Sequence, residues 1–191
     1  IIYRCQRSER SIGATLHTLI ARGAITREEL IVCTKGGYLP FDGEVPEDPG
    51  RYIVKTVMDP GLASPEDIVA GCHCLAPAYL DHALAMSLQN LRLDTIDVYY
   101  LHNPEQQLDA VDRATCLDRV EAAFARLEAH ARAGHLHAYG VATWNGLRAN
   151  PASKSYLPLE TLVERAQRVG GAQHHFRVVQ LPYNLAMPEA F

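Results

Sequence analysis

The sequence lacks the features that mark several large classes of protein. Its 18 basic and 22 acidic residues give a formal net charge of -4, so there is no basic surface of the kind that binds nucleic acid or anionic membranes. No apolar run approaches the roughly 18 residues that a membrane-spanning helix needs. These shortages argue against nucleic acid and membrane as the main partners.

Cysteine is present, but not in a disulfide pattern. The five cysteines are an odd number at irregular spacing, which predicts a reducing, cytoplasmic compartment. The closest grouping, Cys72-His73-Cys74, offers at most three metal ligands, and no second Cys or His pair lies at the spacing of a structural zinc site. We therefore predict no metal site.

What the sequence does contain is an alternation of helix and strand patterns. Apolar residues recur at helical spacing in four segments, which begin near residues 9, 77, 113 and 158. Short apolar runs predict strands at 30–34, 96–101, 137–142 and 177–181. In the first helix, over 9–22, we expect Ser8 to cap the first turn. We expect its apolar side chains to share one face, namely Ile12, Leu16, Leu19 and Ile20.

The order of these elements predicts the fold. The last three strands begin roughly 40 residues apart with one helix between neighbours, which is typical of right-handed β-α-β units. This connectivity fits a doubly wound sheet or part of an eight-stranded barrel. No Gly-x-Gly-x-x-Gly follows a predicted strand, so the barrel is favoured. We predict an α/β fold, an incomplete (β/α)8 TIM barrel with about the second to sixth β/α units, in one domain over 1–191 with a long loop insertion at about 36–64.

The ends of the chain bear on this prediction. The chain starts without Met in Ile1-Ile2-Tyr3, which is typical of the end of a strand, and it stops at Phe191 soon after another strand-like run. We therefore expect a piece of a longer polypeptide with two unpaired strand edges.

Reactive side chains stand where predicted strands end. His102 directly follows an apolar strand and precedes Pro104, and side chains at the carboxyl ends of parallel strands point into the ligand crevice. Lys35 follows the strand at 30–34, just before two glycines that allow a close approach to a ligand. Tyr3 precedes the first helix. A phenol is a poor acid near pH 7 unless a nearby cation stabilises the phenolate. The plainer alternatives, a rim tyrosine and a surface lysine, stay open.

Further polar residues lie beside these three. Asn103 and Glu105 can orient His102, line the mouth of the site or be solvated loop residues. Thr143, Asn145 and Gln180 stand at strand ends and suit contacts with an amide or hydroxyl, although Asn145-Gly146 is also a common turn sequence.

Taken in order, these residues resemble the aldo-keto reductase family. Tyr3 followed by Ser8-Glu9 resembles that family's segment after the second barrel strand, and Lys35 closes the third strand as the family's lysine does. The run that ends in Tyr99-Tyr100-Leu101-His102 matches the fourth strand with its histidine. The fifth and sixth strands end in Gly140-Val141-Ala142-Thr143 and in Gln180. The resemblance spans the whole chain.

The resemblance implies an NADPH-dependent oxidoreductase that reduces an aldehyde or ketone to an alcohol by hydride transfer. Tyr3 is then the general acid, Lys35 its supporting cation and His102 the group that polarises the substrate carbonyl. Gln180, Thr143 and Asn145 are implied as contacts of the NADP(H) cofactor, with Asn145 as a substitute where Ala142 and Thr143 replace the family's Ser-Asn pair. The small-molecule carbonyl substrate is the implied partner.

The resemblance also has gaps. The family's catalytic aspartate would lie before Ile1, and its loop for the adenosine phosphate would lie after Phe191, so we expect the 191 residues alone to be inactive. Two other functions stay open. One is a non-catalytic NADP-binding regulatory subunit on the same barrel, and the other is a lyase or hydrolase that uses Lys35 as a Schiff-base amine.

Overall fold

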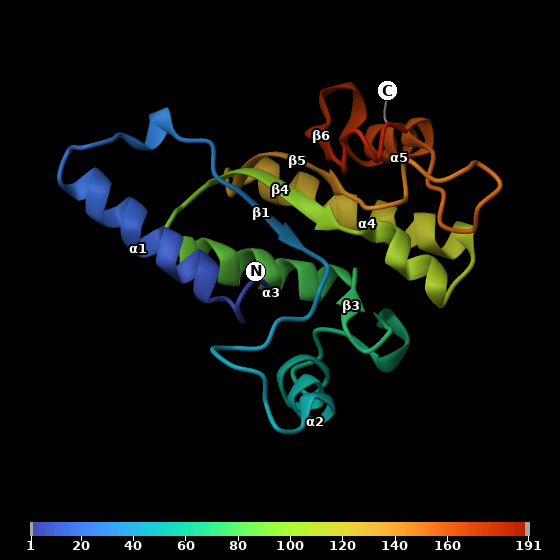
Figure 1. The fold of residues 1–191 in the computed structure, drawn as a ribbon, viewed down its shortest axis with the longest axis horizontal. Helices are drawn as coiled ribbons and strands as arrows, with labels where there is room; N and C mark the ends of the chain where they lie inside the picture. The colour runs from blue at the N-terminus through green and yellow to red at the C-terminus, as the bar shows by residue number, and fades with distance from the viewer. Residues whose placement is uncertain (1, 190–191) are drawn as a thin grey trace.

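One four-stranded parallel sheet forms the centre of the chain in a computed structural model that describes residues 2–189. Its strand order is β1-β4-β5-β6, with every neighbouring pair parallel (Figure 1). The strands are β1 (Cys33–Gly36), β4 (Ile96–His102), β5 (Leu136–Ala142) and β6 (Phe176–Gln180). The four predicted strands are therefore confirmed. β1 begins three residues later than predicted, because pairing with β4 begins only at Cys33.

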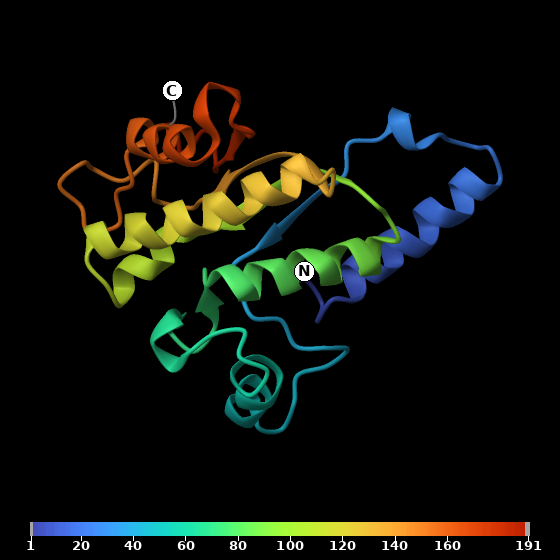
Figure 2. The ribbon, with the colours of Figure 1, turned by 180° about the vertical axis from the view of Figure 1, so that it is seen from behind.

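The main helices alternate with these strands and lie on one face of the sheet, as the two opposite views show (Figures 1 and 2). They are α1 (Arg7–Ala21), α3 (Pro77–Leu91), α4 (Arg113–Arg132) and α5 (Leu159–Gly170), with short 3-10 turns at Arg27–Glu29, Pro104–Asp109 and Gly171–Gln173. A parallel sheet with helices on one face is the arrangement of an incomplete (β/α)8 barrel, as predicted. No helix among residues 2–189 is long and apolar enough to cross a membrane.

The core lies between the sheet and helices α3, α4 and α5. Phe124 of α4 is fully buried and packs against Tyr139 of β5 and Phe176 of β6, with ring centroids 5.1 and 5.2 Å away. The ends of α4 are fixed by local signals. The Asp112 carboxylate accepts from the backbone N–H of Thr115 at 2.8 Å, and Gly134 follows the helix at φ 82°.

Helix α1 buries residues outside the apolar face that Ile12, Leu16, Leu19 and Ile20 were expected to share. Only Glu9 and Gly13 are buried, whereas Ile12 is 48% exposed and the other three are half-buried. The reason is close packing on α3, since a Cβ on Gly13 would clash with the backbone carbonyl of Asn90. The predicted Ser8 cap is wrong, because the helix starts after Gln6 and no side chain caps it.

The segment predicted as a long loop over 36–64 leaves the sheet and carries short structure of its own. It contains α2 (Pro49–Ile53) and a π-helical turn, η2 (Val54–Met58), and is followed by the 3-10 turn η3 (Pro65–Asp67). A small antiparallel hairpin then forms from β2 (Ile68–Val69) and β3 (His73–Cys74). We call residues 37–74 the inserted segment. A second apolar cluster holds it against α3, with Leu39, Ile53 and Val57 packed beside Tyr79 and Ala83.

Candidate active site

Tyr3, Lys35 and His102 meet at the carboxyl end of the sheet. Lys35 lies near the end of β1 and His102 is the last residue of β4, on adjacent parallel strands. The Lys35 Nζ donates to the Tyr3 hydroxyl at 3.3 Å and lies 5.7 Å from the centre of the phenol ring. The Tyr3 and His102 ring centroids are 6.2 Å apart. A phenol, an ammonium and an imidazole therefore share one site.

A cavity of about 270 Å³ opens at this point. Thr143 and Gln180, two of the three residues predicted to contact the cofactor, line it together with the three reactive residues. Asn145 is exposed and is not among the lining residues, so its cofactor role stays a prediction. The remaining lining residues are Asn103, Ala142, Trp144, Leu181 and Pro182.

The imidazole of His102 is neutral at physiological pH. Burial, followed by the positive charge of Lys35, lowers the pKa of His102 to about 4. Neither ring nitrogen of His102 has a hydrogen-bond partner among residues 2–189. A neutral imidazole carries one N–H, which can donate to a carbonyl oxygen of a ligand in the cavity.

The turn after β5 is built around Glu105. One oxygen of its buried carboxylate accepts from the Thr143 hydroxyl at 2.5 Å and from the backbone N–H groups of Trp144, Asn145 and Gly146 at 2.9, 3.1 and 3.3 Å. Glu105 is neither solvated nor aimed at His102. The Thr143 hydroxyl also accepts from the Gly146 N–H at 2.7 Å, so its proton is committed to Glu105 and it can only accept from a ligand.

Two other side chains at the cavity are available to a ligand. Gln180 is exposed, and its side-chain amide has no hydrogen-bond partner among the described residues, while its backbone carbonyl accepts from the Thr143 N–H at 2.9 Å. Trp144 is 57% exposed and lines the cavity. Sequence reasoning passed over Trp144, although an aromatic residue one place after a strand-end threonine was a usable signal.

A strained turn presents Tyr3 to the cavity. Arg4, Cys5 and Gln6 all adopt left-handed backbone angles, with φ of 52°, 52° and 68°. Each such residue costs about 1–2 kcal/mol, so other contacts must hold the turn. The Gln6 amide is buried, donates to the Phe41 carbonyl at 3.4 Å and accepts from Asn90 at 3.1 Å.

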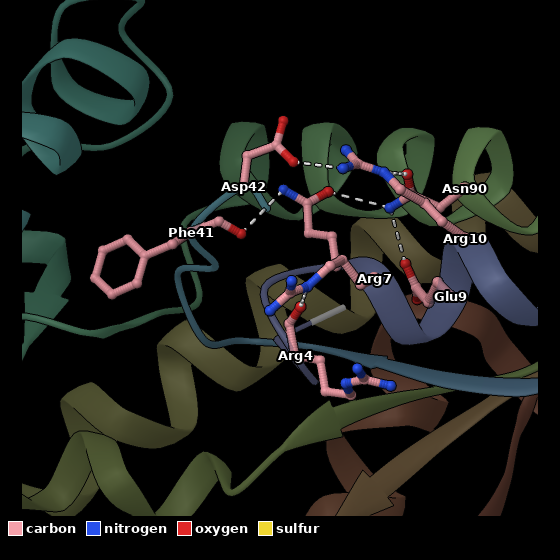
Figure 3. A network of polar contacts seen from close by, with 8 residues as sticks. Arg4, Arg7, Glu9, Arg10, Phe41, Asp42 and Asn90 are labelled. Atoms are coloured by element: carbon pink, nitrogen blue, oxygen red, sulfur yellow. Dashed lines mark hydrogen bonds and ion pairs between the residues drawn. The ribbon is translucent and has the colours of Figure 1, made fainter. Parts of the chain in front are cut away.

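The first turns of α1 extend this anchorage to α3 and β1. Asn90 also donates to the buried carboxylate of Glu9, and Arg10 pairs with Asp42 at 2.6 Å (Figure 3). Glu9 accepts further from the hydroxyls of Thr34 at 2.5 Å and Ser87 at 2.9 Å. Glu9 therefore joins α1, α3 and β1 behind Tyr3.

No group of three or more His, Cys, Asp or Glu side chains within residues 2–189 could hold a metal ion. In the Cys72-His73-Cys74 run, both nitrogens of His73 are engaged with protein groups.

The chain is similar to known proteins of one family. A model described as the aldo/keto reductase family matches residues 2–168. Among solved structures, an aldo-keto reductase from Bacillus halodurans in its holo form matches 95% of this chain at 17% identity, with a TM-score of 0.55. At that identity the likeness shows the fold alone. The chain spans 41% of that structure's length. No curated protein matches the chain significantly.

Proposed function

The chain belongs to the aldo/keto reductase family, and from that premise we propose that it carries the catalytic groups of an NADPH-dependent oxidoreductase that reduces an aldehyde or ketone to an alcohol. The observation that supports this most is the 3.3 Å contact between Lys35 and Tyr3 beside the His102 ring in one cavity. A small-molecule carbonyl compound is the proposed substrate.

The chemistry asks for a proton donor and fixed dipoles at one oxygen atom. Hydride transfer places negative charge on the carbonyl oxygen, so groups that meet that charge lower the barrier. Tyr3 donates its hydroxyl proton to this oxygen, and the Lys35 ammonium stabilises the phenolate that is left. The neutral His102 donates an N–H to the same oxygen and orients the carbonyl group.

The cofactor fits this site at its reacting end. A bound NADPH supplies the hydride. The exposed amide of Gln180 suits its nicotinamide carboxamide, because an amide offers a donor and an acceptor side by side. Thr143 contributes an acceptor only. The cavity of about 270 Å³ lies near the lower limit for ligand pockets and suits the nicotinamide with a small carbonyl compound, not the whole dinucleotide.

We propose further that turnover requires chain outside these 191 residues, because the family's aspartate and adenosine-phosphate loop have no counterpart within them. All five cysteines are free thiols, which supports a reducing, cytoplasmic location. Activity is therefore to be measured in a full-length protein that contains this chain.

Replacing Tyr3 by Phe tests the assignment of the acid. Tyr3→Phe should lower kcat at least about a hundredfold, the usual scale for a general acid. Tyr183→Phe is the matched control, because Tyr183 is 61% exposed and does not line the cavity. Rates for Tyr3→Phe near those of the control would refute the assignment.

Two observations favour a second function, a non-catalytic NADP-binding regulatory subunit. The Thr143 hydroxyl is committed to Glu105, and Asn145 is not among the residues that line the cavity, which leaves fewer groups to fix the cofactor amide. Offering a panel of aldehydes and ketones to protein loaded with NADPH separates the two functions. Oxidation of the cofactor supports the reductase, whereas retained NADPH without turnover supports the regulatory subunit.

A further inference from the structure

The inserted segment contributes a buried histidine, His73, that contacts the backbone of the site residue His102. His73 of β3 has no exposed surface. Its Nε2 lies 2.8 Å from the backbone carbonyl oxygen of His102, and its Nδ1 lies 2.7 Å from the side-chain nitrogen of Gln107. Both ring nitrogens are therefore occupied, one of them on the main chain of the residue that we assign to the carbonyl group.

Arg119 fixes the direction of each hydrogen bond in the series that runs through Gln107 and His73 to His102. A guanidinium can only donate, so the oxygen of the Gln107 amide must face Arg119, which lies 2.6 Å from it. The Gln107 nitrogen then donates to the Nδ1 of His73. The proton of the imidazole is left on Nε2, where it donates to the carbonyl of His102. Burial lowers the pKa of His73 to about 4, so the ring keeps this neutral form at pH 7.

Packing adds to the hydrogen bonds. The ring of Tyr38 meets the rings of both His73 and His102 edge-on, at centroid distances of 4.8 and 4.9 Å. Gly37, at φ 130°, allows the backbone to approach both histidines closely. A Cβ there would lie 3.1 Å from the His102 carbonyl oxygen and 3.2 Å from the His73 Nε2. These contacts hold the backbone of His102 on the side of His73, while its ring nitrogens have no hydrogen-bond partner among the described residues.

The inserted segment does not itself reach the cavity. No residue between 36 and 101 lines it. Arg119 of α4 ties the segment to the body of the fold, because its second terminal nitrogen donates to the backbone carbonyl of Glu66 at 2.8 Å. One arginine therefore fixes both the inserted segment and the amide that orients His73.

We propose that His73 is a positioning residue and that the inserted segment is a brace, which holds the main chain at the end of β4 so that the His102 ring faces the substrate carbonyl. The assignment of His102 rests on the proposed function. The brace itself is a property of the ground-state structure and can be tested without turnover.

The first test measures the tautomer of His73 in the full-length protein labelled with nitrogen-15. Long-range proton–nitrogen spectra at pH 7 should show a neutral ring with a bare Nδ1 and a protonated Nε2. A ring protonated on Nδ1, or on both nitrogens, would overturn the proposal, because Nδ1 could not then accept from Gln107. This result does not depend on whether the protein reduces carbonyl compounds.

The second test compares two substitutions in the full-length protein. His73→Phe keeps an aromatic ring but cannot donate to His102, whereas His73→Gln loses the ring and keeps an N–H at a similar reach. A brace predicts a fall in kcat of about tenfold or more for His73→Phe with little change in KM, and rates within about threefold of wild type for His73→Gln. Equal losses in both, or a larger loss in His73→Gln, would contradict it.

If the protein proves not to be a reductase, the variants His73→Phe and His73→Gln are compared by the chemical shift of the His102 ring protons. This shift should move in His73→Phe and return toward the wild-type value in His73→Gln. An unmoved shift in His73→Phe would overturn the brace, while absence of turnover in wild type with the expected shifts would count against the proposed function alone.

Discussion

Replacing Glu105 by Gln should destabilise the protein by about 3 kcal/mol, and the structure supplies both contributions to this figure. One carboxylate oxygen accepts from four donors, of which the Thr143 hydroxyl at 2.5 Å and the Trp144 N–H at 2.9 Å are the shortest contacts. Hydrogen bonds to a charged acceptor contribute about 1.5–3 kcal/mol each, and a neutral acceptor keeps about half of that. The loss over these two contacts is therefore about 1.5 kcal/mol or more.

The second contribution comes from the other oxygen of Glu105. It is buried and has no hydrogen-bond partner among the described residues. If the amide nitrogen of the glutamine takes this place, its N–H donors are buried and unsatisfied. If it takes the place of the other oxygen, it replaces the acceptor of the four hydrogen bonds. A buried unsatisfied donor costs about 1–3 kcal/mol. The substitution keeps the shape of the side chain, so no cavity adds to this sum.

Urea unfolding followed by tryptophan fluorescence measures this effect, because Trp144 is the sole tryptophan and lies in the turn that Glu105 holds. Glu164→Gln is the control, since Glu164 is exposed on α5 and such surface changes stay within about 0.5 kcal/mol. A change for Glu105→Gln no larger than that of the control would refute the reasoning.

Three further predictions concern stability. Gly13→Ala should cost about 1–3 kcal/mol, because its Cβ would meet the Asn90 backbone, and thermal unfolding equal to wild type would contradict the close packing of α1 on α3. Phe124→Ala should cost about 3–5 kcal/mol in urea unfolding, since the ring is fully buried between Tyr139 and Phe176, and a loss under 1 kcal/mol would contradict that packing. Burial lowers the pKa of His73 to about 4, below the roughly 6.5 of an unfolded chain, so the unfolded state binds more protons between these values and stability falls as the pH drops from about 6.5 toward 4. Urea midpoints at pH 7 and pH 5 should differ more in wild type than in His73→Gln, and equal differences would contradict the shift.

The repeating part of the fold was predictable because its signals are local. Periodic apolar residues and Gly134 gave α4, and the regular spacing of apolar runs gave the parallel strands. The alternation of these elements left a doubly wound sheet and a barrel open, and the lack of a Gly-x-Gly-x-x-Gly after any predicted strand favoured the incomplete barrel. The short helix α2 was missed although its signal was present, because Asp48 accepts from the Arg51 N–H and Pro49 stands at the first helical position.

The face of α1 was not predictable from periodicity. The apolar stripe that contains Ile12 suggests one side, but the close approach of Gly13 to α3 and the buried carboxylate of Glu9 decide for another. An amphipathic helix is expected to bury apolar residues, and the buried Glu9 is an exception to this rule. Its partners Thr34 and Ser87 lie 25 and 78 positions away along the chain.

The same difference separates the predicted and the missed parts of the site. Lys35 and His102 were found because each follows a predicted strand, and strand ends meet at one edge of a parallel sheet. Tyr3 was found because it directly precedes the first helix, although residues 2–6 form a turn and not the end of a strand. The roles of Glu105 and His73 were not predicted, because the tertiary fold sets the contact of Glu105 with Thr143 and that of His73 with His102. Nothing in the spacing of Cys72-His73-Cys74 distinguishes a brace from a surface hairpin.

Transfer of a labelled hydride tests the central proposal most directly. A full-length protein that contains this chain is incubated with an aldehyde and with NADPH deuterated at the transferable position, and the alcohol is analysed by mass spectrometry. The account predicts one deuterium on the former carbonyl carbon in wild type and in Tyr183→Phe, and almost no labelled alcohol in Tyr3→Phe. Unlabelled alcohol in wild type, or equal labelling in all three proteins, would contradict it.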